Sequence, residues 1–216
     1  MTNPEFSTVS NYSRSAFLNG RVVRTPSGVS LPSFFPAGAE IYAQGEKCRG
    51  LYRVEFGAVR VYRLLADGRR QISAFHLAGE IFGFEADELH HFFAEAICAT
   101  GIRPLHMSSA SGELAGELLP MVLEGLVRAQ EHLLVLGRQN AMERIAAFLV
   151  DMSERQGGLQ QVELPMSRTD IADYLGLTIE TVSRAFSKLK QKGVIRLPSL
   201  RRVELVKWQL LQDMAA

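Results

Sequence analysis

Cysteine is scarce in this sequence: its 216 residues include only Cys48 and Cys98. Two cysteines are too few for a disulfide framework, and so low a count is typical of a protein from a reducing compartment. They are also too few for an iron–sulfur cluster, which needs about four thiolate ligands. A redox-sensing role has little support, because only Cys48 has cationic neighbours, Lys47 and Arg49.

Long apolar runs are absent as well. No segment approaches the roughly 18 to 20 apolar residues of a membrane-spanning helix, and the first residues lack the basic-then-apolar order of a signal peptide. We therefore expect a cytoplasmic protein with no membrane partner. The length and a hydrophobic content of 47% are those of a globular chain with two domains.

Net charge is only +1, so the total charge predicts no nucleic-acid partner, but the charges are unevenly distributed. Seven Lys or Arg residues and no carboxylate lie between Arg184 and Arg202. Five carboxylates and no Lys or Arg lie between Gly79 and Thr100. The basic segment is the candidate for contact with a polyanion.

The first part of the chain predicts a tail followed by strands. Residues 1–30 are rich in Ser, Asn and Thr without periodicity, so we expect a partly disordered tail there. From Phe35 onward, short β-branched and aromatic runs alternate with turn signals, and Asp67-Gly68 predicts a two-residue hairpin turn. This pattern predicts an antiparallel barrel or jelly roll, which we place at 31–110.

A long helix is expected at 111–140. Apolar residues recur there at intervals of four and three, which is the spacing of a helical dimer seam: Val122, Leu126, Ala129, Leu133 and Leu136. Leu123 and Leu134 widen the apolar face, which would let the helix pack against its own barrel as well. A helix buried within one subunit is the alternative.

The C-terminal domain is expected at 141–216 and begins with another helix. Ile145, Phe148 and Leu149 give that helix an apolar face, and Gly157-Gly158 ends it.

Two short helices around a glycine turn follow. Ser167 and Asp170 form a capping box at the start of the first helix. Gly176 supplies the turn, Thr178 caps the second helix, and Gly193 ends it. This arrangement predicts a helix-turn-helix.

The second of these helices has one apolar and one polar face. Its polar face carries Glu180, Ser183 and Arg184 at helical spacing near the N-terminus. Arg can read guanine O6 and N7, and Glu can accept a hydrogen bond from cytosine N4. We therefore predict that these three side chains read DNA bases. A merely solvated polar face is the alternative.

Basic and hydroxyl side chains surround this face. Those predicted to contact DNA phosphates are Arg168, Thr178, Ser187, Lys188, Lys190, Arg201 and Arg202. The segments 194–197 and 201–205, joined by a turn at 198–200, predict a two-stranded wing beside the helix.

These residues carry a resemblance over most of the chain. Phe35-Pro-Ala-Gly38, Gly79-Glu-Ile-Phe-Gly83 and Glu180-Thr-Val-Ser-Arg184, together with the long helix, resemble the Crp/Fnr superfamily, and its FixK-type branch most closely. The fold this implies is α+β: a jelly-roll barrel like the cyclic-nucleotide-binding domain, a dimerisation helix and a winged helix-turn-helix.

The resemblance also implies a function. It implies a homodimer that binds a palindrome of the form TTG, eight central bases, CAA, and recruits RNA polymerase. Glu180, Ser183 and Arg184 then correspond to the base readers of the family. A transcription activator in low-oxygen or nitrogen-fixation gene control is expected.

The sequence does not favour a nucleotide effector. The family's Arg-Ser or Arg-Thr pair is missing from the segment 91–98, and we expect Glu95 to repel a phosphate there. Glu80 retains the ability to contact a ribose-like hydroxyl. We therefore expect a regulator without small-molecule effector or cofactor. A cyclic-nucleotide-gated regulator and a protein-interaction module remain the alternatives.

His90 and His91 beside Glu85 suggest a metal or acid–base centre only weakly. Adjacent histidines on an exposed acidic loop are usually solvated, and no further ligand has suitable spacing. No nucleophile motif or phosphate loop accompanies them, so we expect neither a metal site nor an enzyme.

Overall fold

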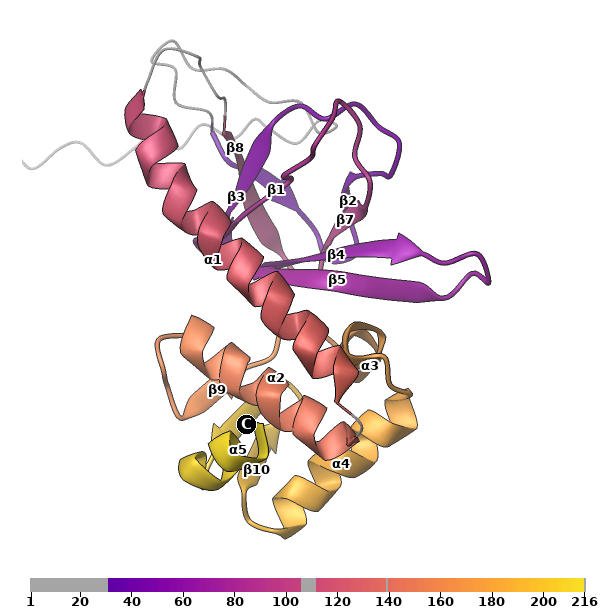
Figure 1. The fold of residues 1–216 in the computed structure, drawn as a ribbon, viewed down its shortest axis with the longest axis vertical. Helices are drawn as coiled ribbons and strands as arrows, with labels where there is room; N and C mark the ends of the chain where they lie inside the picture. The colour runs from indigo at the N-terminus through magenta and orange to yellow at the C-terminus, as the bar shows by residue number, and fades with distance from the viewer. Residues whose placement is uncertain (1–30, 106–111, 139, 216) are drawn as a thin grey trace, which may run out of the picture.

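The computed structural model describes residues 31–105, 112–138 and 140–215. The expected tail at 1–30 and the domain boundary near residue 110 lie outside these ranges. Within them, strands make up the N-terminal half and helices most of the C-terminal half. Figure 1 shows α1 (Gly112–Gly137) running alongside the first half and ending against the second.

The N-terminal half consists of two four-stranded antiparallel sheets. Their strand orders are β1-β8-β3-β6 and β2-β7-β4-β5. The strands are β1 (Ser33–Phe35), β2 (Glu40–Tyr42), β3 (Leu51–Phe56), β4 (Ala58–Leu64), β5 (Arg70–Leu77), β6 (Ile81–Phe82), β7 (Phe93–Ala96) and β8 (Thr100–Leu105). Inward-facing side chains such as Val54 and Val59 fill the core between the sheets. The predicted fold class is confirmed.

Turn geometry explains two glycines of this half. Gly57, between β3 and β4, has φ +83°, and a Cβ there would lie 2.5 Å from the Ala99 carbonyl oxygen, so only glycine fits. Gly68 has φ +80° in the β4–β5 hairpin. The hairpin forms as expected, but its loop covers residues 65–69 instead of two residues. The Asp67 carboxylate accepts a hydrogen bond from the Arg69 amide, which stabilises this longer loop.

The C-terminal half contains four helices after α1 and a small sheet in the described residues. The helices are α2 (Ala141–Arg155), α3 (Arg168–Leu175), α4 (Ile179–Gln191) and α5 (Trp208–Ala215). The sheet has the order β10-β11-β9, with β9 (Gln161–Glu163), β10 (Ile195–Ser199) and β11 (Arg202–Leu205).

The predicted two strands of the wing pair with each other as β10 and β11, but two details differ from the prediction. The sheet has a third strand, β9, which the sequence does not reveal because it is three residues long with only Val162 buried. The turn lies at residues 200–201, and Pro198 belongs to β10. Proline is tolerated because β10 is an edge strand and its register shifts between Arg196 and Ser199.

The two halves share one hydrophobic core. Ala58, Ile72 and Phe75 of the β4–β5 sheet belong to the same buried cluster as Phe148 of α2 and Ile171 of α3. This packing places α2 and α3 directly against the outer face of β4 and β5.

Candidate nucleic-acid interface

The local sequence builds the helix-turn-helix as predicted. The Ser167 hydroxyl accepts a hydrogen bond from the Asp170 amide, and the Asp170 carboxylate accepts one from the Ser167 amide, which completes a capping box. Gly176 ends α3 in the left-handed conformation, with φ 62°. The Thr178 hydroxyl accepts a hydrogen bond from the Thr181 amide and caps α4.

Helix α4 presents one free polar face. Its apolar residues Val182, Ala185, Phe186 and Leu189 are buried. Glu180, Ser183 and Arg184 are all exposed, and the Arg184 guanidinium makes no hydrogen bond or ion pair within the described residues. The backbone amide of Glu180 and the Thr178 hydroxyl hold the pKa of the Glu180 carboxyl below its usual 4.5. The structure thus brings the three predicted base readers together as a charged acceptor, a hydroxyl and an unpaired guanidinium.

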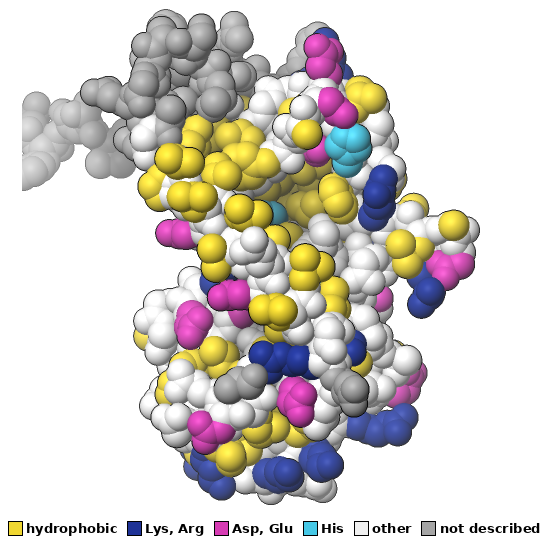
Figure 2. All heavy atoms as spheres, viewed as in Figure 1, with side chains coloured by type: hydrophobic (Ala, Val, Ile, Leu, Met, Phe, Trp, Pro, Cys, Tyr) yellow, Lys and Arg dark blue, Asp and Glu magenta, His cyan; other side chains and the backbone are white. Residues whose placement is uncertain are grey.

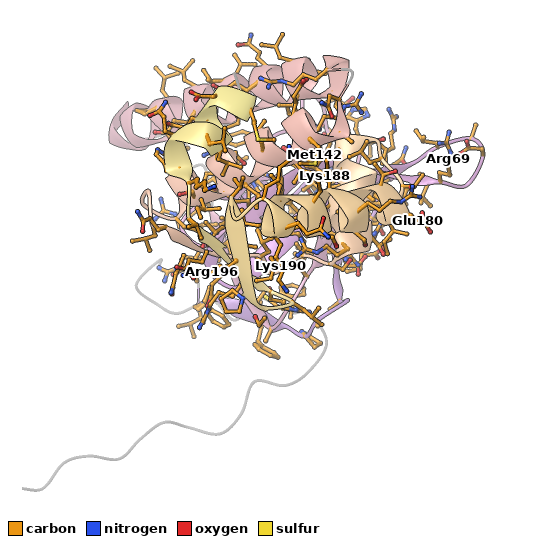
Figure 3. All side chains as sticks on the ribbon, turned by 90° about the horizontal axis from the view of Figure 1, so that it is seen from below. Arg69, Met142, Glu180, Lys188, Lys190 and Arg196 are labelled. Atoms are coloured by element: carbon orange, nitrogen blue, oxygen red, sulfur yellow. The ribbon has the colours of Figure 1, made fainter. Side chains whose placement is uncertain are left out.

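Basic side chains surround this face. Figure 2 shows Lys and Arg gathered at the end of the molecule that α4 and β10 form. Figure 3 shows Glu180 on α4 at one side of this end, with Lys188 and Lys190 further along the helix and Arg196 on β10. Lys188, Lys190 and Arg201 are exposed. This end of the molecule therefore has the charge distribution of a DNA-binding surface.

Three predicted phosphate contacts already have partners. The Arg202 guanidinium donates to the Glu163 carboxylate at 2.7 Å, an exposed pair that a phosphate can replace. The Ser187 hydroxyl donates to the Ser183 carbonyl at 2.9 Å. The Thr178 hydroxyl is occupied as the cap of α4. The sequence could not reveal the Glu163 contact, because the strand that carries this residue was not predicted.

Arg168 differs from the other predicted phosphate contacts. Its guanidinium carbon lies 3.3 Å from the centroid of the Phe186 ring, so it links α3 to α4 by a cation–π contact. Burial lowers the pKa of Arg168 to about 10. One guanidinium nitrogen, Nη1, is buried without a hydrogen-bond partner in the described residues.

The predicted seam on α1 is largely open to solvent in the single chain. Exposed fractions are 53% for Leu126 and 68% for Leu133. Val122 and Ala129 are exposed and Leu136 is half-buried. Leu123 and Leu134, which widen the predicted apolar face, are both exposed as well. Leu118 of α1 is buried, and Val135 packs against the core that the two halves share.

The expectation that Glu95 repels a phosphate is wrong, because its side chain points away from the barrel core. Ala94 and Ala96 of β7 are buried, whereas the Glu95 carboxylate is bound by the Arg60 guanidinium on the sheet's outer face. Alternation of side chains along the strand explains this orientation.

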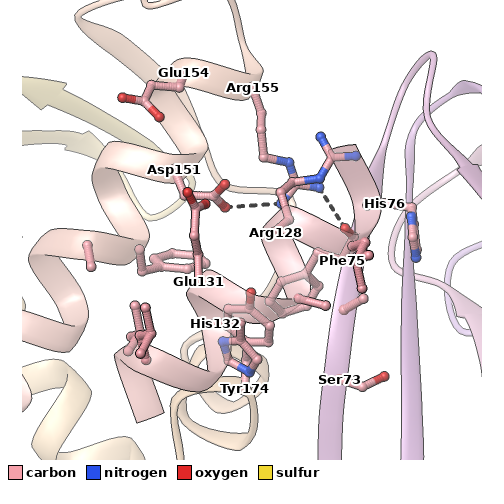
Figure 4. Close-up of a pocket in the computed structure, with 18 of the residues that line it drawn as sticks. Ser73, Phe75, His76, Arg128, Glu131, His132, Asp151, Glu154, Arg155 and Tyr174 are labelled. Atoms are coloured by element: carbon pink, nitrogen blue, oxygen red, sulfur yellow. Dashed lines mark hydrogen bonds and ion pairs between the residues drawn. The ribbon is translucent and has the colours of Figure 1, made fainter. Parts of the chain in front are cut away.

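Glu80 is also unavailable to a ribose. The Arg155 guanidinium of α2 binds the Glu80 carboxylate with two hydrogen bonds of 3.0 and 2.8 Å. Arg155 also donates to the Asp151 carboxylate and the Phe75 carbonyl (Figure 4). The residue thus fastens α2 to the barrel.

A cavity of about 570 Å³ lies between β5, α1, α2 and α3. Figure 4 shows His76 of β5, Arg128 and His132 of α1, and Tyr174 of α3 around it. The His132 ring stacks on Tyr174 at 3.8 Å between centroids, so α1 touches the first helix of the helix-turn-helix.

His76, which lines this cavity, makes the free energy of unfolding depend on pH. Burial lowers the pKa of His76 from its usual 6.5 to about 4, with Arg155 and Arg128 adding to the effect and Glu80 opposing it. The unfolded chain therefore binds more protons between these pH values. The contribution of His76 to the free energy of unfolding should be fully present above pH 6.5 and fall by about 3 kcal/mol as the pH decreases to about 4. Burial also lowers the pKa of His132 to about 4, so a further loss from that residue occurs in the same pH range.

His76→Gln should reduce this loss, as measured by urea unfolding at pH 7 and pH 4.5. His91→Gln, a substitution of an exposed histidine, is the control and should retain the wild-type decrease. An equal decrease in both variants would contradict the assignment to His76.

The expectation that His90 is solvated is wrong. Its ring is buried, stacks on Tyr42 at 3.6 Å between centroids, and its Nδ1 lies 3.0 Å from the Glu85 carboxylate. His91, the second residue of the pair, is exposed beside Asp87. Among the described residues, no group of three or more His, Cys, Asp or Glu side chains has the geometry to hold a metal ion.

Both cysteines are free and half-buried. No helix in the described ranges is long and apolar enough to cross a membrane.

Comparison with known proteins agrees with this architecture. The family model of the cyclic nucleotide-binding domain matches residues 32–107, and that of the Crp-like helix-turn-helix domain matches residues 143–214. The nitrogen fixation regulation protein FixK of Rhizobium meliloti is 55% identical over 188 residues, which cover 87% of this chain and 89% of that protein. FixK of Azorhizobium caulinodans is 41% identical, over 92% and 82% of the two chains.

A solved structure is similar over nearly the same range. FixK2 from Bradyrhizobium japonicum superposes with a TM-score of 0.79 and 43% identity, covering 86% of this chain and 98% of that one. The chain belongs to the Crp/Fnr superfamily of transcription regulators, in its FixK-type branch.

Proposed function

We propose that this regulator activates transcription by binding a palindromic operator as a homodimer and recruiting RNA polymerase. The observation that carries the proposal is the free face of α4, where Glu180, Ser183 and Arg184 are exposed while the opposite face is buried. A guanidinium and a carboxylate one helical turn apart match a guanine and a cytosine in the major groove. The operator is then a pair of TTG-like half-sites around about eight central bases, one helical turn apart between centres.

The α1 seam supports the homodimer. Exposed apolar side chains along one face of a 26-residue helix are costly in water, and a second copy of the same helix covers them. A two-fold axis along α1 also gives the two reading faces the symmetry of a palindrome.

Two contacts and the residues of β7 support the same activity without a small-molecule effector. Glu80 is bound by Arg155, Glu95 by Arg60, and alanines occupy the inward positions of β7. No free guanidinium from β7 therefore faces the barrel core.

We place the effector-type barrel at 31–110, the dimerisation helix at 111–140 and the DNA-binding domain at 141–216, acting in the cytoplasm. The relatives in Rhizobium meliloti and Azorhizobium caulinodans are named for regulation of nitrogen fixation. We extend that role, under low oxygen, to this chain.

Binding of fluorescent duplexes by the purified chain, after dialysis against nucleotide-free buffer, tests this function. We expect the palindrome to bind at least about 1,000-fold more tightly than a shuffled duplex. Cyclic AMP and cyclic GMP should leave both affinities unchanged. Equal affinity for both duplexes, or operator binding only with a cyclic nucleotide, would contradict the proposal.

Lys190→Ala should weaken binding to every duplex by a similar factor. The lysine is exposed near the end of α4, where a phosphate contact contributes no sequence information. The slope of log K against log salt concentration should decrease in magnitude by about 1.8, since a bound dimer loses two phosphate contacts worth about 0.9 each.

Lys47→Ala is the matched control, since it removes one exposed positive charge from the barrel and should leave the slope unchanged. A sequence-selective loss in Lys190→Ala would show that this residue reads bases.

A further inference from the structure

The Asp170 carboxylate joins the helix-turn-helix to the barrel. The Asp170 side chain is only 4% exposed. Its Oδ2 accepts hydrogen bonds from the Ser167 amide and hydroxyl and so caps α3. Its Oδ1 accepts hydrogen bonds from Arg60 of β4 at 3.0 Å and from Arg70 of β5 at 2.6 Å. The carboxylate that completes the capping box of α3 is thus also an anchor on the sheet.

Further contacts extend this anchor along α3. Arg70 also pairs with the Asp173 carboxylate at 2.8 Å, and the side-chain amide of Gln71 donates a hydrogen bond to the Asp173 backbone carbonyl at 2.7 Å. On the barrel side, Arg60 is held by Glu95 of β7. We call these six residues the latch: Arg60, Arg70, Gln71, Glu95, Asp170 and Asp173.

The latch restricts the orientation of α3 relative to the sheet more strictly than apolar packing can. Guanidinium–carboxylate hydrogen bonds are directional, whereas apolar contacts tolerate sliding and rotation. The Arg60 and Arg70 side chains are 16% and 23% exposed, so solvent screens these pairs less than surface pairs. Two arginines from adjacent strands bind successive turns of α3. They therefore prevent the helix from sliding along its axis and from rotating about it.

This attachment leaves the reading face free. The latch holds the first two turns of α3, while Glu180, Ser183 and Arg184 of α4 remain exposed. Since α4 packs on α3 through buried residues such as Ile171 and Val182, fixing α3 also fixes α4. The direction of the reading face is therefore set relative to the barrel and to α1.

We propose that Arg60 and Arg70 are positioning residues that set the separation and orientation of the two reading helices in the dimer, with no ligand bound. This inference rests on the proposed function. Without the latch, only a fraction of the dimers hold both reading helices at the spacing that a palindrome requires. The apparent affinity for the palindrome falls in proportion to that fraction. Contact with a single half-site needs no such register.

Arg70→Gln and the double variant Arg60→Gln/Arg70→Gln test this role. They leave the capping box and all the residues of α4 in place. The affinity for the palindrome should fall by about tenfold in the double variant, and the preference for eight over seven or nine central bases should weaken. The affinity for a duplex with one half-site should change by less than about twofold, because the reading face is intact.

Arg69→Gln is the matched control: it removes a neighbouring arginine of the same hairpin that pairs only with exposed Asp67. It should retain wild-type affinity and spacing preference. The exchange Arg70→Asp/Asp173→Arg should recover part of the spacing preference that Arg70→Asp alone loses.

An unchanged spacing preference in the double variant overturns the inference, as does an equal loss of affinity on the single half-site, which would indicate damage to the helix-turn-helix itself. Neither result affects the proposed function. That function fails if the wild-type chain does not distinguish the palindrome from a shuffled duplex, or binds the palindrome only with a cyclic nucleotide.

Discussion

Replacing both Leu126 and Leu133 with glutamate should convert the protein to monomers and lower its affinity for the palindrome by about 100-fold or more. Both side chains lie on the seam and are more than half exposed in the single chain. Two helices that meet along this face would bring four carboxylates into an apolar interface, where each loses hydration. A dimer holds its second reading helix at high local concentration beside the second half-site, and a monomer loses that gain.

Light scattering coupled to gel filtration gives the oligomeric state, and fluorescence anisotropy gives the affinity. Glu124→Ala is the matched control, because this exposed residue lies about 200° around the helix from Leu126. It should remain dimeric and bind normally. Substitutions at exposed positions should change monomer stability by no more than about 0.5 kcal/mol, so misfolding is not expected. A glutamate variant that stays dimeric would place the dimer interface elsewhere.

Arg184→Ala should weaken operator binding by about 1 to 3 kcal/mol for each half-site and relax discrimination at one base pair of each half-site. The reason is geometric: the guanidinium is exposed, unpaired within the described residues and one helical turn from Glu180. A bidentate contact to guanine is lost entirely, while the phosphate contacts are retained. The measurement is anisotropy on duplexes that carry each of the four bases at every half-site position.

Arg184→Lys separates charge from shape. Lysine retains the positive charge but not the planar fork of donors, so it should keep the affinity for shuffled DNA and still lose base discrimination. If both variants lost affinity equally on every duplex, Arg184 would be a phosphate contact and not a base reader.

The helix-turn-helix could be predicted from sequence because its determinants are local. The capping box spans Ser167 to Asp170, and the turn depends on Gly176. The two faces of α4 follow from helical periodicity alone, with Val182 and Phe186 on one and Arg184 on the other. The barrel fold was predictable for the same reason, from alternating strands and turn glycines. The placement of the predicted DNA contacts on one surface follows from these elements, although their roles stay predictions.

Contacts between distant residues could not be predicted. Arg155 and Glu80 are 75 positions apart, and Arg60 and Asp170 are 110 apart. Sequence patterns report which face of an element is apolar but not which charged residue of another element meets it. For this reason Glu80, Glu95 and His90 were assigned to solvent or to ligand chemistry, whereas the fold uses their side chains in internal contacts.

Selection of bound duplexes from a random library, with the wild-type chain in nucleotide-free buffer, tests the central claim most directly. The account predicts enrichment of two inverted TTG-like half-sites separated by about eight bases, from a dimeric protein without added ligand. Enrichment of single half-sites, of no sequence, or of a palindrome only in the presence of a cyclic nucleotide would contradict a ligand-independent dimeric reader.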